Sequence, residues 1–364
     1  MERFFLAALC RAPGVGSRVA ASLVRVFGSA QDAWHARAEA LRAAHLSPER
    51  AAALYDFCRR NEALPEEIAA ACEKGDISLF VPSDEAYPAL LKEIYNPPQT
   101  LFCRGSLDCL KHPVVAMVGA RHASAYGKGA AEDIALGLAE RGFVVVSGAA
   151  RGIDTASHKG ALQAGETVAV LGCGVDVAYP RENARLLMEI AEKGAVISEY
   201  APGTAPLAAF FPARNRIISG VAHGTIVVEA AERSGSLITA EFALSEGRDV
   251  FAVPGSIYSA TSRGCHRLIQ QGARLVVSAA DVAAEYEDSA PRTSASPPQE
   301  LTEEEAAVYA LLSREAALSL DELICRLQGK AANVAFLLLG LRVKGLVEET
   351  PMRTYIRSAK GKSV

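Results

Sequence analysis

The fold is decided by the stretch from Val114 to Gly152, VVAMVGARHASAYGKGAAEDIALGLAERGFVVVSGAARG. Its first five residues, Val114 to Val118, are all apolar, which is typical of a strand buried on both faces of a sheet. Apolar residues then recur at helical spacing from Ala131 to Leu138, before a second buried run from Phe143 to Val146. The stretch therefore predicts a β-α-β unit with a glycine- and arginine-containing turn after its first strand.

Further buried runs follow along the chain, with helical patterns between most of them. They are Val168–Leu171, Ala195–Ser198, Thr225–Val228, Val250–Val253 and Leu275–Val277. This alternation predicts an α/β fold with a parallel sheet covered by helices on both faces, a Rossmann-like architecture. Ligands of such sheets bind at the carboxyl ends of the strands. Small residues such as Gly119, Ser147 and Gly148 stand there, and they allow a ligand to approach the backbone.

The N-terminal stretch predicts a separate helical domain. It is rich in alanine, and Gly14-Val15-Gly16 followed by Ala20 and Leu23 has the spacing of a helix-hairpin-helix. The turn of such a hairpin either holds a nucleic-acid phosphate or only packs two helices together, and the sequence leaves both readings open. From Leu64 to Gly105 the chain reads as a connecting segment with a double proline.

The C-terminal stretch predicts a winged helix after a linker. The linker, from Glu285 to Glu300, is acidic and then rich in proline and serine, without periodicity. Two capping-box starts, a third helix from Asn333 to Val343 and a hairpin follow it. The expected domains are residues 1–63 (helical, SAM- or helix-hairpin-helix-like), 64–286 (extended Rossmann-like), 287–300 (linker) and 301–364 (winged helix).

Composition narrows the functional class. The formal net charge of −4 argues against a uniformly basic coat for nucleic acid, so any polyanion is expected to meet a local patch. The eight cysteines form no C-x-x-C pair and no metal-ligand spacing, so we expect reduced thiols and no metal. No segment has the length of a membrane span, and the start MERFFLAALC is too short for a secretory signal, which favours a cytoplasmic protein.

No cofactor loop is expected in the turn after Val118. Gly119, Gly127 and Gly129 cluster there, but Arg121 stands where G-x-G-x-x-G needs its second glycine. An arginine in this turn instead directs a planar, five-donor group toward an anion at the start of the helix. This arrangement favours a phosphodiester over a bound dinucleotide.

Two further segments add candidates for anion binding. In FFPARNRIISG, Arg214, Asn215 and Arg216 follow two aromatic residues, and we expect one arginine to brace the loop through Glu199 or Glu229 and the other to face a ligand. In YPRENARLL, Tyr179 offers a stacking ring and Arg181 begins a helix.

Asp154 and His158, four residues apart on a predicted helix, resemble an acid and base pair. No nucleophile elbow accompanies them, and the alternative is that Asp154 or a neighbour caps the helix after Gly152 and that His158 holds the helix to the next loop. We favour this structural role over catalysis.

The motifs together resemble the DNA-processing protein A family (DprA, also called Smf). The resemblance runs from Tyr87 to about Val282 and includes SGAARGIDTASHKGAL, FPARNRIISG, RSGSLITAEFAL and GRDVFAVPGS. It implies a protein without enzymatic activity that binds single-stranded DNA, protects incoming DNA and loads the RecA recombinase onto it during natural transformation.

The resemblance also implies roles for single residues. Arg121 and Arg181 match the phosphate-contacting positions, and Arg214 to Arg216 match a shared arginine motif. The implied homodimer would use His266, Ile269 and Leu275, and Leu244 and Gln270 would lie near the RecA-facing surface. The rival hypothesis is a nucleotide hydrolase that uses Glu229 or Glu232.

Overall fold

The structure is a computed structural model that describes residues 1–286, 301–313, 317–327, 331–344, 346–350 and 354–357. It divides into two compact units, Met1–Thr293 and Ser294–Val364, which are described separately below. The predicted linker at 287–300 lies outside the described residues.

The first unit is built on a nine-stranded sheet in the order β1-β2-β6-β5-β4-β3-β7-β8-β9. The strands are β1 (Ser78–Phe80), β2 (Leu101–Gly105), β3 (Val114–Val118), β4 (Val144–Ser147), β5 (Thr167–Val170), β6 (Ala195–Ser198), β7 (Gly224–Val227), β8 (Asp249–Ala252) and β9 (Arg274–Leu275). The seven strands from β3 to β9 pair in parallel, which confirms the predicted Rossmann-like core.

The edge of the sheet formed by β1 and β2 was not predicted. Strand β2 pairs antiparallel with β6, and β1 pairs antiparallel with β2. The double proline before Leu101–Gly105 predicts a connecting segment in this region. Its pairing with β6, almost a hundred residues later, makes it a strand, and this contact is invisible to local patterns.

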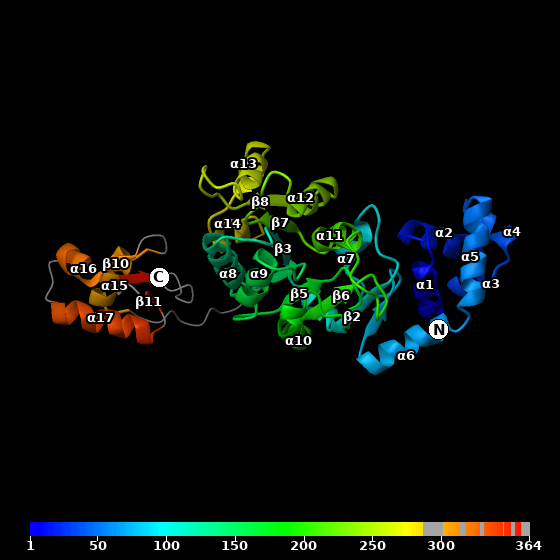
Figure 1. The fold of residues 1–364 in the computed structure, drawn as a ribbon, viewed down its shortest axis with the longest axis horizontal. Coiled ribbons are helices and arrows are strands. Elements are labelled where there is room, and N and C mark those ends of the chain that lie inside the picture. Colours follow the sequence, from blue (N-terminus) through cyan, green and yellow to red (C-terminus); the bar gives the residue numbers. More distant parts are fainter. Residues whose placement is uncertain (287–300, 314–316, 328–330, 345, 351–353, 358–364) are drawn as a thin grey trace. The chain divides into compact units, whose positions relative to one another are not determined.

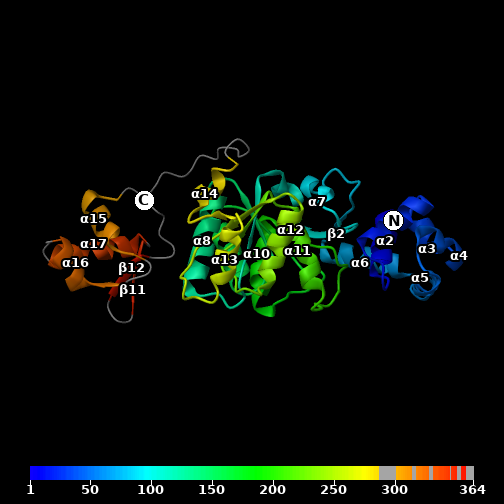
Figure 2. The same ribbon diagram turned by 90° about the horizontal axis from the view of Figure 1, so that it is seen from above.

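Helices cover both faces of the sheet (Figures 1 and 2). One face carries α8 (Ala125–Ala139), α9 (Ile153–Ala161), α10 (Ala184–Lys193) and α14 (Ala279–Ala283). The other carries α7 (Ala89–Glu93), α11 (Phe210–Gly220), α12 (Gly235–Ser245) and α13 (Arg263–Gln270). Alternate residues of each strand point to opposite faces, so Val115 and Met117 pack under α8 while Ala116 and Val118 pack in the other layer. Short 3₁₀ turns, η2 (Leu107–Lys111) and η3 (Arg181–Asn183), complete this region.

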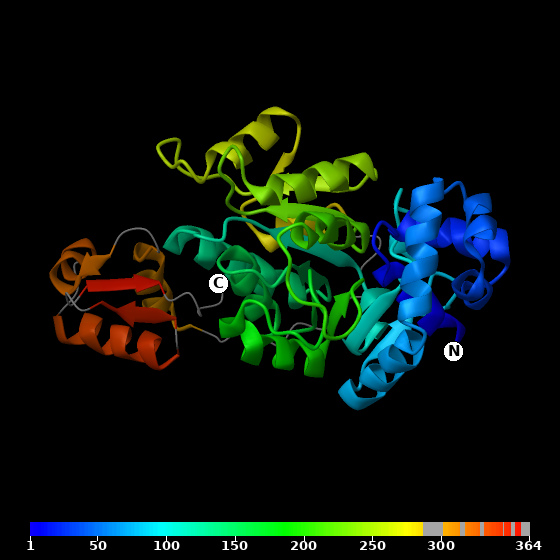
Figure 3. The same cartoon turned by 45° about the vertical axis from the view of Figure 1, so that its right-hand side comes forward.

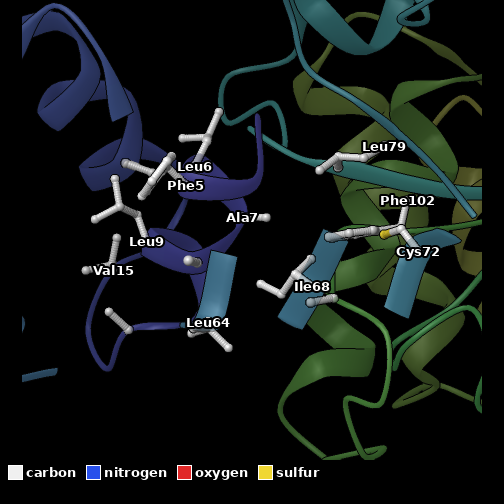
Figure 4. Packing of buried hydrophobic residues seen from close by; sticks show 14 of the residues in the cluster. Phe5, Leu6, Ala7, Leu9, Val15, Leu64, Ile68, Cys72, Leu79 and Phe102 are labelled. Atoms are coloured by element: carbon white, nitrogen blue, oxygen red, sulfur yellow. The ribbon is translucent and has the colours of Figure 1, made fainter. Parts of the chain in front are cut away.

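The N-terminal helices pack against the edge of the sheet. They are α1 (Glu2–Arg11), α2 (Ser17–Phe27), α3 (Ala30–His35), α4 (Ala38–Leu41), η1 (Arg42–Ala44), α5 (Pro48–Arg60) and α6 (Leu64–Gly75). Figure 4 shows apolar residues of α1 and α6 in one cluster with Leu79 of β1 and Phe102 of β2. Arg3 Nη1 also donates to the Leu79 carbonyl at 2.7 Å. This contact area explains why residues 1–293 form a single unit.

The predicted hairpin of the first two helices is present. Gly14 has φ +78°, which suits glycine, and Gly16 is the N-cap of α2. Beside this turn, Arg18 donates to the Tyr95 hydroxyl at 3.0 Å and its guanidinium lies 5.1 Å from the centre of that ring. Arg18, a basic residue beside this turn, therefore packs against Tyr95.

The second unit is a winged helix, as predicted. It contains α15 (Glu303–Leu311), α16 (Leu320–Leu327) and α17 (Ala331–Val343), with a sheet in the order β10-β12-β11 formed by β10 (Leu318–Ser319), β11 (Val347–Glu349) and β12 (Thr354–Arg357) (Figure 3). Thr302 and Glu305 form the predicted capping box at the start of α15. The third helix exposes Phe336 and Leu339, which are 75% and 55% accessible.

The eight cysteines are free, and six of them are buried. Within the described part of the chain, no helix is long and apolar enough to cross a membrane. No cluster of three or more histidine, cysteine or acidic side chains suited to a metal ion occurs among the same residues.

Candidate nucleic-acid interface

A cavity of about 680 Å³ opens at the carboxyl ends of β3 and β7. In the sheet, β3 lies between β4 on one side and β7 on the other, so the strand order reverses between β3 and β7. Ligands of α/β sheets bind at such a point of reversal. The walls come from the turn after β3, from α11 and from the start of α12. The lining includes Gly119, Arg121, Asp154, Tyr179, Phe211, Arg214, Asn215, Ser234, Ser236 and Thr239.

Arg121 and two aromatic rings form the accessible part of the cavity. The Arg121 side chain is exposed, and its guanidinium carbon lies 5.8 Å from the centre of the Phe211 ring. The Phe211 ring centre is 5.2 Å from that of Tyr179, which is 41% exposed. A cation next to two partly exposed rings can hold a phosphate while a base stacks beside it.

Arg214 lies deeper, where it braces the floor of the cavity. It is 4% exposed, and Nη1 donates to the Gly148 carbonyl at 2.9 Å and to the Val170 carbonyl. Burial lowers the pKa of Arg214 to about 10, against the opposing effect of Asp154. A Cβ atom on Gly148 would lie 2.7 Å from the guanidinium, so glycine makes room for this arginine.

The other two residues of the arginine motif have different tasks. Asn215 is half-buried in the cavity wall, and its Nδ2 donates to the Gly235 carbonyl at 3.4 Å. Arg216 does not line the cavity: Nη2 contacts Glu199 Oε2 at 2.5 Å and Ser17 Oγ at 3.4 Å. The expectation that one arginine pairs with Glu199 is therefore confirmed, and the predicted contact of Arg216 with DNA is corrected to a bracing role.

Ser147 and Gly148 also need correction. Both are buried and neither lines the cavity. The Ser147 hydroxyl donates to the Met117 carbonyl at 2.6 Å, which ties β4 to β3. Both residues are buried at the carboxyl end of β4, so they support the cavity without lining it.

Asp154 and His158 make structural contacts, but Asp154 does not cap the helix as expected: the N-cap of α9 is Gly152, and no side chain makes a capping hydrogen bond there. Asp154 Oδ2 accepts from the Ala150 backbone N–H at 3.2 Å, just before α9. His158 is fully buried, and its Nδ1 lies 2.8 Å from Thr167 Oγ1 at the start of β5. Burial lowers the pKa of His158 to about 3, so the ring is neutral and faces no ligand. Unlike His158, Asp154 lines the cavity, which the sequence analysis did not foresee.

Arg181 lies on the same rim but outside the cavity. It is exposed at the start of η3, two residues after Tyr179. The neighbouring Glu182 is paired with Arg151, whose Nη2 lies 2.7 Å from Glu182 Oε2. This pairing neutralises the nearby acid and leaves Arg181 as an exposed cation two residues from Tyr179.

The start of α12 is the part of the site that sequence reasoning missed. Ser234 is the N-cap of this helix, and Ser236 and Thr239 follow on the side that lines the cavity. A serine N-cap signal was present in RSGSLITAEFAL, but nothing local indicates that this helix start meets the turn after β3.

Glu229, one of the two carboxylates that the hydrolase hypothesis would use, is held in hydrogen bonds within the protein. It is 2% exposed and accepts from the Ser124 N–H at 2.9 Å, the Ser124 hydroxyl at 2.7 Å and the Thr261 hydroxyl at 3.2 Å. It therefore ties the start of α8 to the loop after β8. Glu232 is exposed, 4.0 Å from Arg263.

The residues expected at a dimer or partner surface lie on and around α12 and α13. His266 Nε2 lies 3.0 Å from the Gly255 carbonyl, and Ile269 is half-buried. Leu244 and Leu275 are 59% and 48% exposed, and Gln270 is exposed. These five positions remain predictions.

Comparison with known proteins identifies the family of the chain. Residues 78–287 match the family model of DNA recombination-mediator protein A, and residues 292–351 match that of the DprA winged helix domain. DNA processing protein DprA of Streptococcus pneumoniae is 56% identical over 205 residues, which is 56% of this chain and 72% of that protein. DNA processing protein DprA of Bacillus subtilis is 44% identical over 221 residues, 60% of this chain and 74% of the relative.

Two solved structures resemble the present one. The X-ray structure of DprA from Streptococcus pneumoniae superposes with a TM-score of 0.70 at 42% identity, covering 78% of this chain and 98% of that chain. A structure of DNA processing protein A from Helicobacter pylori, which concerns that protein's binding of single-stranded DNA, gives a TM-score of 0.54 at 28% identity and covers 59% and 97%. The extent of these matches shows that the chain belongs to the DNA recombination-mediator protein A family, known also as DprA or Smf.

Proposed function

We propose that this protein binds single-stranded DNA at the cavity between β3 and β7, without sequence preference, as a binding protein and not as an enzyme. The observation that carries the proposal is the exposed Arg121 guanidinium beside the rings of Phe211 and Tyr179. Phosphate contacts supply most of the affinity in such interfaces, and stacking on aromatic rings is tolerant of base identity.

A relative supports the proposed binding of single-stranded DNA. The Helicobacter pylori member of the family binds single-stranded DNA. We propose that the present protein protects incoming DNA and loads RecA recombinase onto it during natural transformation. Its homodimer contacts would involve His266, Ile269 and Leu275, and Leu244 and Gln270 would face RecA.

Fluorescence anisotropy with labelled single-stranded and duplex oligonucleotides over a salt series tests the binding proposal. We expect tight binding of the single strand that weakens as salt rises, and weaker binding of the duplex. Arg121→Ala and Arg181→Ala should each lower the affinity and reduce the salt slope by about 0.7, because each removes one phosphate contact.

The matched control is Arg141→Ala. Arg141 is also exposed, but it follows the far end of α8, where it donates to the Gly137 carbonyl at 2.8 Å. This variant should bind like the wild type. Unchanged affinity and slope in both Arg121→Ala and Arg181→Ala would disprove the assignment of the site. RecA filament assembly on a coated single strand, with Leu244→Arg and Gln270→Arg, then tests the loading step.

A further inference from the structure

An exposed ion pair joins two segments at the carboxyl edge of the sheet. Arg151, in the turn after β4, faces Glu182 of η3: Nη2 lies 2.7 Å from Oε2, and Nε contacts Oε1. The two side chains are 59% and 51% exposed. The planar fork of a guanidinium matches two oxygens of a carboxylate and two oxygens of a phosphate equally well. Glu182 therefore occupies a group whose geometry suits a phosphate.

This ion pair is not needed to hold the two segments together. Asn183, which is 6% exposed, donates from Nδ2 to the Ala149 carbonyl and to Thr155 Oγ1, both at 2.9 Å. The buried amide already connects η3 to the turn after β4 and to α9. Exposed ion pairs contribute little to stability. An anion could thus replace Glu182 at Arg151 without loosening the fold.

Arg151 lies between the two arginines that are proposed to contact the strand. Gly152, the next residue, packs on the turn after β3, because a Cβ atom there would lie 2.6 Å from the Arg121 carbonyl oxygen. On the other side, the partner Glu182 directly follows Arg181 in the chain. The strands β3, β4 and β5 are neighbours in the sheet, about 4.8 Å apart. Exposed arginines from the segments after these three strands therefore line one edge.

We propose that Arg151 binds a phosphate of the strand where it leaves the cavity, and that Glu182 occupies this position in the free protein. The inference rests on the proposed binding of single-stranded DNA and adds a third phosphate contact together with an internal competitor for it. The strand would pass from Arg121 over Arg151 to Arg181. A phosphate that reaches Arg151 alone gains nothing over Glu182, so the exchange requires the other contacts of a bound strand.

The decisive variant is Arg151→Ala/Glu182→Gln, which removes the pair and keeps the net charge of the protein. Anisotropy titrations with labelled oligothymidylate over a salt series measure its affinity. We expect binding about three- to tenfold weaker than that of the wild type, with a salt slope smaller by about 0.7, because one phosphate contact is lost. Glu182→Gln alone should bind about two- to fivefold more tightly than the wild type, because the competing ion pair is gone.

The matched control is Arg59→Ala/Glu62→Gln. It removes another exposed pair, in the N-terminal helical region, where Arg59 Nη1 lies 2.6 Å from Glu62 Oε1. This variant should bind like the wild type. Wild-type affinity and slope in Arg151→Ala/Glu182→Gln would overturn the phosphate contact and leave the proposed function standing. Failure of the wild-type protein to bind any single strand would instead overturn the proposed function.

Two further comparisons test the exchange itself. If Glu182→Gln tightens binding equally with Arg151 present and in an Arg151→Ala background, Glu182 acts by repulsion alone and the exchange is wrong. Inorganic phosphate, added at constant ionic strength, distinguishes a strand phosphate from a free one, and we expect it not to displace the strand. Displacement from the wild type but not from Arg151→Ala/Glu182→Gln would overturn the proposal in favour of a free-phosphate site.

Discussion

At the scale of residues, two arginines that are close in the sequence brace different parts of the protein. Arg214 is buried in the cavity floor and bound to backbone carbonyls, and Arg216, on the same helix, is paired with Glu199 away from it. The local sequence does not distinguish the two arginines, because their contacts depend on the segments that pack around each side chain in the folded protein. Arg121 in the turn after β3 remains exposed and available to a ligand.

His158 provides a residue-scale prediction about pH. Its pKa is about 3 in the fold and near 6.5 when unfolded, so below pH 6.5 the unfolded chain takes up a proton that the folded protein excludes. Stability contributed by neutral His158 is therefore lost as pH falls, by about 2 kcal/mol between pH 7 and pH 5. Urea denaturation at a series of pH values measures it.

The matched variant is His158→Asn, which keeps a donor near the position of Nδ1 for Thr167 Oγ1. The variant should have a lower free energy of unfolding than the wild type at pH 7. On going from pH 7 to pH 5, its free energy of unfolding should fall by about 2 kcal/mol less than that of the wild type. Burial raises the pKa of Asp154 and of Glu199, an effect of opposite sign that both proteins share. Parallel pH profiles for the two proteins would contradict the prediction.

At the scale of elements, the start of α8 is fixed by a residue from another strand. Ser124 caps the helix by accepting from the Gly127 N–H at 3.0 Å, and Glu229, after β7, accepts from both the N–H and the hydroxyl of Ser124. A Cβ atom on Gly127 would lie 2.4 Å from that carboxylate, so the glycine serves close packing and not a cofactor. The turn that carries Arg121 is thereby anchored.

We expect Glu229→Gln to lower the free energy of unfolding by about 1–3 kcal/mol, because an amide leaves at least one of these donors facing another donor. Thermal or urea denaturation measures the loss. Glu132→Gln is the control, because Glu132 lies on α8 and accepts a hydrogen bond from Gln163 at an exposed site. Equal stability of the two variants would show that Glu229 does not anchor the helix.

At the scale of the whole molecule, every residue that lines the cavity belongs to the first unit. A chain truncated after Tyr286 should therefore keep single-strand affinity within about twofold of the full chain, because compact units with their own cores fold independently. Anisotropy titrations of the two chains at equal salt provide the comparison. A much larger loss would assign part of the binding surface to residues 287–364.

The sequence by itself determined the fold class, the parallel core strands to within one or two residues, the winged helix and some of the residues around the cavity. Periodicity and glycine turns are local, so they can be recognised without knowing the partner of each segment. Arg121 could be found in this way because it stands close after a strand, and Tyr179 because it stands just before a helical turn. Asn215 lies in the middle of α11 and was found only because it stands between two arginines.

Only the tertiary structure decided which of these residues face the cavity. It buried Ser147, paired Arg216 with Glu199, brought the start of α12 to the turn after β3 and added the antiparallel strands β1 and β2. Each of these outcomes depends on contacts between segments that are distant in the chain. The physical reason is that the burial and the partners of a polar side chain depend on the segments that pack against it. A local sequence pattern carries no information about those segments.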